Sequence, residues 1–104
     1  MSGKETEAGT GTSVETRETV EVPRMYRVLL HNDHYTTMDF VVYVLQDVFR
    51  KSLDEAVRIM LNVHRSGIGI CGFYPFDVAE TKVVTVHSLA REEGFPLKCS
   101  MEPE

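Results

Sequence analysis

The chain has 104 residues, a formal net charge of −5 and a hydrophobic fraction of 42%. This length suits one small domain, and the mild acidity, with no run of five Lys or Arg residues, argues against a nucleic-acid surface. No secretory apolar segment opens the sequence, and its apolar stretches are too short to cross a bilayer. We therefore expect a soluble, cytoplasmic protein without a membrane partner, in which Cys71 and Cys99 stay reduced instead of forming a disulfide.

The N-terminal residues 1–22 differ in composition from the rest. They are mainly Gly, Ser, Thr and Glu with isolated valines, so they cannot bury enough apolar surface to offset the entropy lost on ordering. We predict a disordered extension here. Residues 23–104, which begin at a proline, then form one domain near the lower size limit for folding without disulfides or metals.

The first structured elements are a strand and a helix. Residues 26–31 are strand-like, and a strand would place Tyr26, Val28 and Leu30 on one face and Arg27, Leu29 and His31 on the other. Residues 38–50 show helical spacing of apolar side chains without a helix breaker, and Thr36 or Thr37 is placed to cap this helix.

A second helix is predicted from a capping box. Ser52 followed by Glu55 is the cap pattern, and Gly67 suits the left-handed residue that ends a helix. Between them an apolar stripe recurs at helical spacing, with His64 near its C-terminal end; its members are Ala56, Val57, Met60, Leu61, Val63 and His64.

The next segment reads as a strand over residues 68–74, followed by a break at Pro75. Asp77 and Glu80 repeat the cap pattern and open a third helix that ends at Gly94.

The last part of the chain contains one conflict. The β-branched residues 83–86 favour a strand locally, but their place between two helix-end signals and the helical spacing around them favour helix. Residues 95–101 then alternate as a half-buried strand. The predicted fold is α+β, in the order β-α-α-β-α-β: a small three-stranded antiparallel sheet with three helices packed on one side.

The polar cluster at residues 32–36 is the candidate site. One interpretation is that Asn32 and Asp33 serve only the conformation of a turn and the capping of the helix that follows. His64 would then be a half-buried histidine that bonds to the backbone. The other is that Asn32, Asp33 and His64 converge beside an apolar hollow. An amide oxygen, a carboxylate and a neutral imidazole are all acceptors, and an ammonium group has only donors. Such a set suits an amine carried by a large apolar side chain.

Two other kinds of chemical site compete with this interpretation. His31 and His34 with His64, Cys71 or Asp33 would supply zinc ligands, but no ligand pair has the spacing of a zinc motif. Cys71 with His64 would be a nucleophile and base, but a thiol inside an apolar strand is more often inert. We therefore expect no cofactor, no metal and no catalysis.

Four blocks of sequence together form a recognisable pattern: residues 31–41 (HNDHYTTMDFV), 60–64 (MLNVH), 70–72 (ICG) and 78–83 (VAETKV). In these blocks, and over about residues 22–101, the chain resembles the ClpS family, the adaptors that deliver N-degron substrates to the bacterial ClpA–ClpP protease. It implies a non-enzymatic receptor for proteins whose first residue is Phe, Tyr, Trp or Leu.

The resemblance also implies roles for individual residues. Asn32, Asp33 and His64 would hold the α-amino group of the substrate. The side-chain pocket would be lined or rimmed by Thr36, Met38, Val41, Met60, Val63 and Leu97. The face that docks on the N-terminal domain of a ClpA-type unfoldase would contain Asp77, Glu80 and Lys82, and the N-terminal extension would engage the unfoldase during handover.

The sequence departs from the family pattern at two positions of the loop. His34 stands where the family commonly has a second Asp, and Thr37 replaces a common proline. The first change removes a negative charge and alters the expected preference at the second substrate residue. The competing function is a plain interaction module that has this fold but does not read N-termini.

Overall fold

The computed structural model describes residues 22–104, so the extension predicted for residues 1–22 lies, except for Val22, outside the described residues. Within residues 22–104, three strands and three helices follow one another in the predicted order β-α-α-β-α-β, which confirms the fold class. The strands are β2 (Met25–His31), β3 (Ile68–Pro75) and β4 (Lys98–Pro103). The helices are α2 (Met38–Asp47), α3 (Leu53–Ser66) and α4 (Phe76–Glu93).

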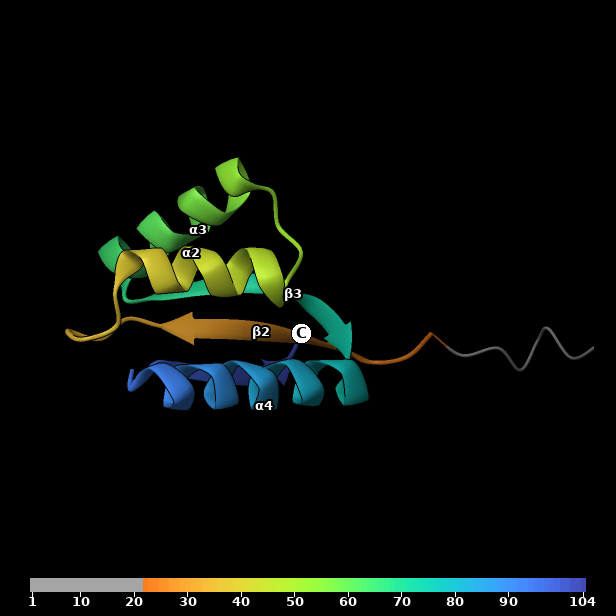
Figure 1. Ribbon diagram of the computed structural model, residues 1–104. Coiled ribbons are helices and arrows are strands. Elements are labelled where there is room, and N and C mark those ends of the chain that lie inside the picture. Colours follow the sequence, from red (N-terminus) through yellow and green to blue (C-terminus); the bar gives the residue numbers. More distant parts are fainter. Residues whose placement is uncertain (1–21) are drawn as a thin grey trace, which may run out of the picture.

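The sheet is antiparallel, with strand order β3-β2-β4. Leu30 in the central strand lies opposite Gly69 on one side and Cys99 on the other. The helices cover one face of this sheet, with α2 and α3 over the β3 side and α4 over β4 (Figure 1). Val28 and Leu30 point from β2 into this layer and are fully buried, so the alternation of the strand determines which face meets the helices.

The ends of α2 and α3 follow local capping rules. The Thr37 hydroxyl accepts a hydrogen bond from the Phe40 amide at 3.1 Å, and the Ser52 hydroxyl accepts one from the Glu55 amide at 3.2 Å. Gly67 ends α3 with a φ of 90°, a left-handed conformation that glycine adopts without strain. Both predicted caps and the predicted stop are therefore confirmed.

Two predicted helix ends differ from the structure. α2 ends at Asp47 instead of residue 50, and the chain then turns sharply, with Arg50 at a positive φ of 58°. The prediction that Asp77 and Glu80 form the cap of α4 is wrong, because Pro75 is the cap residue and makes no side-chain bond. Asp77 lies in the first turn instead, where its negative charge interacts favourably with the positive end of the helix dipole.

The conflict at residues 83–86 is resolved in favour of helix, since these residues lie inside α4. Val86 is fully buried, so its contacts with the core override the local preference for strand. The last strand begins at Lys98, three residues later than predicted. Cys71 and Cys99 are buried free thiols of the core.

Candidate functional site

The loop between β2 and α2 is organised by the Asp33 carboxylate. Its Oδ1 accepts hydrogen bonds from the Tyr35 and Thr36 amides at 2.8 and 2.7 Å. Its Oδ2 accepts one from the Thr36 hydroxyl at 2.7 Å. These are the local bonds of an Asx turn, so the conformational interpretation of Asp33 is correct as far as it goes.

These bonds also determine the charge state of Asp33. Partial burial by itself raises the pKa of the carboxyl, but the hydrogen bonds from Thr36 and Tyr35 outweigh it and lower the pKa below its usual value. The carboxylate therefore stays ionised at neutral pH and gives the loop a fixed negative charge.

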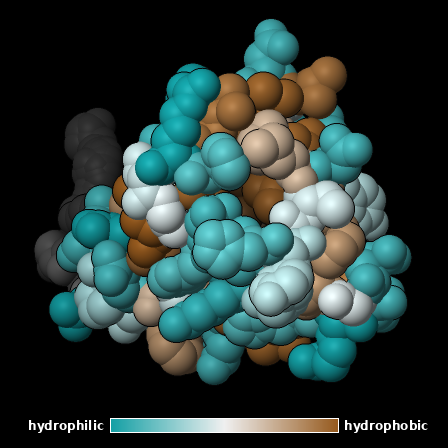
Figure 2. All heavy atoms as spheres, turned by 90° about the vertical axis from the view of Figure 1, so that its left-hand side faces the viewer, coloured by the Kyte–Doolittle hydropathy of each residue, from teal (hydrophilic) through white to brown (hydrophobic). Residues whose placement is uncertain are grey.

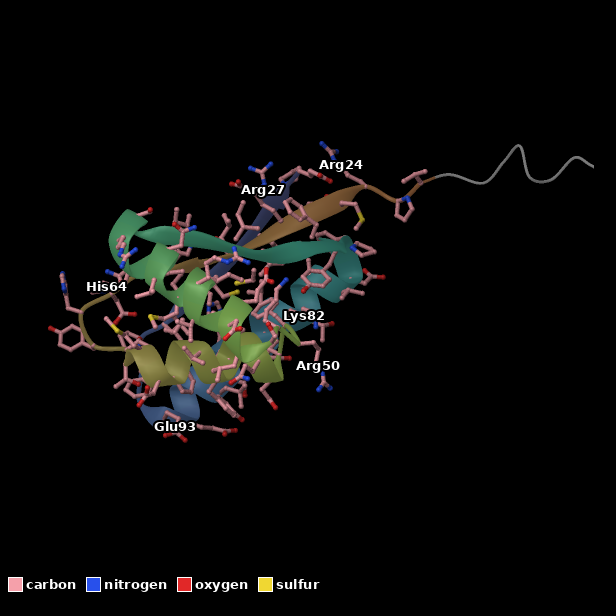
Figure 3. All side chains as sticks on the ribbon, turned by 90° about the horizontal axis from the view of Figure 1, so that it is seen from above. Arg24, Arg27, Arg50, His64, Lys82 and Glu93 are labelled. Carbon is pink, nitrogen blue, oxygen red and sulfur yellow. The ribbon has the colours of Figure 1, made fainter. Side chains whose placement is uncertain are left out.

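A backbone hydrogen bond joins this loop to the end of α3. The Asn32 amide donates to the Gly67 carbonyl at 2.9 Å, across 35 positions of the chain. Because Gly67 directly follows α3, this bond holds the start of the loop beside the last turn of the helix, where His64 lies. Figure 3 shows His64 at this end of the domain, next to the loop that follows β2.

Loop and helices enclose a hollow of about 290 Å³. Its walls combine polar residues of the loop and α3 with apolar residues of α2 and α3, and they are Asn32, Asp33, His34, Thr36, Met38, Val41, Met60, Val63 and His64. On this face of the molecule, hydrophobic residues show at the base of a depression that is bordered below and on its left by hydrophilic residues (Figure 2). The volume is at the lower end of the ~300–1,000 Å³ typical of small-molecule sites, so it suits one amino-acid side chain.

Two of the polar groups are unengaged. Within residues 22–104 no hydrogen bond involves the side chains of Asn32 and His64, and both residues are exposed. Asp33 makes three bonds, and a carboxylate has about four lone-pair directions, so it retains one acceptor position. The mouth of the hollow therefore offers acceptors and a negative charge above an apolar base.

Most residues predicted for the pocket line this hollow, and one does not. Leu97 is 4% exposed in the hydrophobic core and is not among the residues that line the hollow, so its place at the pocket stays a prediction. His34, which belongs to the candidate cluster at residues 32–36 but was given no role in binding the amine or the side chain, also lines the hollow. The half-buried interpretation of His64 is wrong, because the buried stripe of α3 runs through Ala56, Ile59, Met60 and Val63.

The second predicted surface, Asp77, Glu80 and Lys82, lies on the first two turns of α4, with Asp77 and Glu80 exposed. Lys82 is half-buried, and its ammonium group donates to the Val48 carbonyl at 2.8 Å. It also lies 5.1 Å from the ring centre of Tyr74 and 5.8 Å from that of Phe49. Lys82 thus connects α4 to the C-terminal end of α2, where its positive charge also interacts favourably with the negative end of the helix dipole.

Other chemical sites find no support. Residues 22–104 contain no cluster of three or more His, Cys, Asp or Glu side chains able to hold a metal ion. Burial raises the pKa of the Cys71 thiol far above its usual value, so it is not a nucleophile at neutral pH. Over the same residues no helix has the length and hydrophobicity needed to span a bilayer.

Comparison with known proteins gives a consistent result. The family described as "ATP-dependent Clp protease adaptor protein ClpS" matches residues 21–100. An ATP-dependent Clp protease adapter protein ClpS from Desulfatibacillum aliphaticivorans is 66% identical over 90 residues, which is 86% of each chain. The corresponding protein of Oleidesulfovibrio alaskensis is 65% identical over 85 residues, or 82% of each chain.

A solved structure is also similar. It is Agrobacterium tumefaciens ClpS2 bound to L-phenylalaninamide, which is 43% identical in sequence and superposes with a TM-score of 0.77. The match covers 80% of this chain and 100% of that one.

Proposed function

The chain belongs to the ClpS family of Clp protease adaptors, and from this we propose that it binds proteins whose first residue is Phe, Tyr, Trp or Leu. It delivers them to a ClpA-type unfoldase for degradation and catalyses no reaction itself. The observation that carries the proposal is the hollow of about 290 Å³ with apolar walls and a mouth of hydrogen-bond acceptors. The ligand of the Agrobacterium protein is a phenylalanine with a free amino group, which is the chemistry this arrangement suits.

The apolar walls account for the choice of side chain. Met38 and Val41 from α2 face Met60 and Val63 from α3 across the hollow. Burying a Phe or Leu side chain there contributes about 1.5–3 kcal/mol. Met38 is 44% exposed and lies at the start of α2, so its flexible side chain is suited to gate the entrance.

The acceptors account for the requirement of a free N-terminus. Removing an ammonium group from water costs several kcal/mol unless protein groups replace the lost hydrogen bonds. Asn32, Asp33 and His64 supply three acceptors, and each bond to a charged group contributes about 1.5–3 kcal/mol. An internal Phe lacks these donors, so the site rejects it even where the side chain fits.

The two proposed surfaces are far enough apart for simultaneous use. His64 marks the end of the domain with the hollow, and Lys82 lies toward the opposite end (Figure 3). A substrate held at one end leaves the start of α4 free for the unfoldase. Because the Lys82 ammonium group is engaged inside the domain, Asp77 and Glu80 are the side chains expected to contact the partner directly.

The decisive experiment compares two peptides. A dye-labelled peptide that begins with Phe and its N-acetylated form are titrated with the full chain, and fluorescence anisotropy gives each Kd. We expect binding of the free peptide and a loss of at least about tenfold on acetylation, since this removes the charge and two donors. Equal affinity for the two forms would show a plain interaction module.

Single substitutions separate the two surfaces. His64→Ala is expected to weaken the Phe peptide by about tenfold or more, since about 1.4 kcal/mol corresponds to one decade. Glu80→Lys is expected to weaken binding to the isolated N-terminal domain of the unfoldase while leaving the peptide Kd within about twofold. If Glu80→Lys impaired peptide binding instead, the division of labour between the two ends would be wrong.

A further inference from the structure

His34 is a residue of the hollow that the amine-binding arrangement leaves unused. It follows Asp33 in the loop, lines the hollow and is exposed to solvent. We propose that His34 forms a subsite for the second residue of the bound chain, and that its protonated imidazolium favours Asp or Glu at that position. This proposal rests on the proposed function.

The geometry of the loop leaves His34 as the available group. The Asp33 carboxylate turns back into the loop, where it holds Tyr35 and Thr36. His34 makes no hydrogen bond among the described residues, so its ring is free to contact a ligand. When the first side chain of a bound peptide fills the apolar part of the hollow, the rest of the peptide must leave through the polar mouth of the hollow. With three of the polar mouth residues engaged by the amine, the next side chain meets His34.

The charges around the mouth are few. Of the residues that line the hollow, the loop contributes Asp33 and His34, α3 contributes His64, and α2 contributes no titratable side chain. Asp33 and His34 are close enough to interact, since the charge on His34 helps to lower the pKa of the Asp33 carboxyl. A positive charge on His34 therefore acts in the region where the ligand chain leaves.

The expected effect depends on pH, because imidazole side chains change charge between pH 5 and 8 and a Glu carboxylate does not. An ordinary imidazole is mostly neutral at pH 7.5 and contributes little discrimination there. At pH 5.5 an imidazolium facing Glu at position two forms an exposed ion pair. Such a pair is expected to favour Glu over Gln by about two- to fivefold.

The test uses two peptides that differ only at the second residue, Phe-Glu and Phe-Gln followed by the same dye-labelled sequence. The Kd of each for the full chain is measured by fluorescence anisotropy at pH 5.5 and 7.5. Any effect of pH on the binding of the shared α-amino group acts on both peptides alike, so it cancels in the ratio of the two Kd values. We expect the preference for Glu to rise by about two- to fivefold on acidification, and to stay constant with pH in His34→Asn.

Two results would overturn the inference. One is a Glu-to-Gln ratio that does not change between the two pH values. The other is a change that persists in His34→Asn, which would assign it to another group. Failure of the proposed function gives a different result: neither peptide binds, or both bind equally well after acetylation, and the subsite is then refuted with it.

Discussion

Replacement of Asp33 by Asn removes the negative charge at the mouth of the hollow and leaves the loop intact. The Asn side chain keeps an oxygen for the Tyr35 and Thr36 amides, which now bond to Oδ1 at 2.8 and 2.7 Å. Its amide nitrogen replaces Oδ2 and donates to the Thr36 hydroxyl, which accepts as readily as it donates. The variant thus separates the charge of Asp33 from its role in the turn.

The loss in affinity follows from the hydrogen bonds. A bond to a charged group contributes about 1.5–3 kcal/mol and a neutral one about 0.5–1.5 kcal/mol. Oδ1 already accepts two bonds, so the free acceptor position of Asp33 is on Oδ2, which becomes an amide nitrogen in Asn. Asp33→Asn therefore removes the bond to the ammonium group and is expected to cost about 1.5–3 kcal/mol, which raises the Kd of a Phe-initiated peptide by about tenfold or more. The matched control is Asp39→Asn, which removes the same charge from the first turn of α2, outside the hollow.

The assay is fluorescence anisotropy at pH 7.5 and 0.15 M salt, with thermal unfolding by circular dichroism to verify the fold of both variants. The control is expected to change the Kd by less than about twofold, because long-range effects of exposed charges are screened at this ionic strength. If both variants weakened binding equally, the effect would come from net charge, and the acceptor role of Asp33 would be refuted. An unchanged Kd for Asp33→Asn would refute it as well.

Asp33→Asn also gives a prediction for how the stability of the protein depends on pH. The pKa of the Asp33 carboxyl is lowered in the folded protein, so its contribution to stability is present above the unfolded pKa of about 3.9 and is lost as the pH falls through the folded pKa. The difference in free energy of unfolding between the protein and Asp33→Asn should therefore shrink below about pH 4. A difference that stays constant from pH 7 to pH 3 would contradict the assignment.

Three further predictions concern the framework. Lys82→Met removes the hydrogen bond to the end of α2 and should lower the free energy of unfolding by about 1 kcal/mol, or Tm by about 4–8 °C. Lys98→Met, a control at an exposed position, should leave Tm unchanged. If the two variants had the same Tm, the capping role of Lys82 would be disproved. Burial raises the pKa of the Cys99 thiol to about 12 and that of Cys71 further, so a thiol reagent at pH 8 should label both only after unfolding; fast labelling of the native protein would contradict this. In Gly69→Ala the added methyl carbon would lie 2.6 Å from a side-chain methyl of α3. We therefore expect a denaturant titration to show a free energy of unfolding lower by about 1–3 kcal/mol. An unchanged midpoint would contradict this and would show that α3 moves aside without cost.

The outlines of the fold follow from short-range patterns. Ser52 and Gly67 mark the two ends of α3 because a cap depends on residues three or four positions apart, and these are legible in any sequence. The alternation in β2 likewise predicts which residues face the helices. The predicted start of α4 was wrong because its cap residue, Pro75, makes no side-chain hydrogen bond and so lacks the capping pattern on which the prediction relied.

Long-range contacts decided the rest. The sequence contained Asn32, Asp33 and His64, but their meeting depends on the register of β2 with β3 and on the hydrogen bond from the Asn32 amide to the Gly67 carbonyl. Packing of α2 against α3 then encloses the hollow. Local propensity carries no information on such contacts, because their energy comes from surfaces that meet only after the chain has folded.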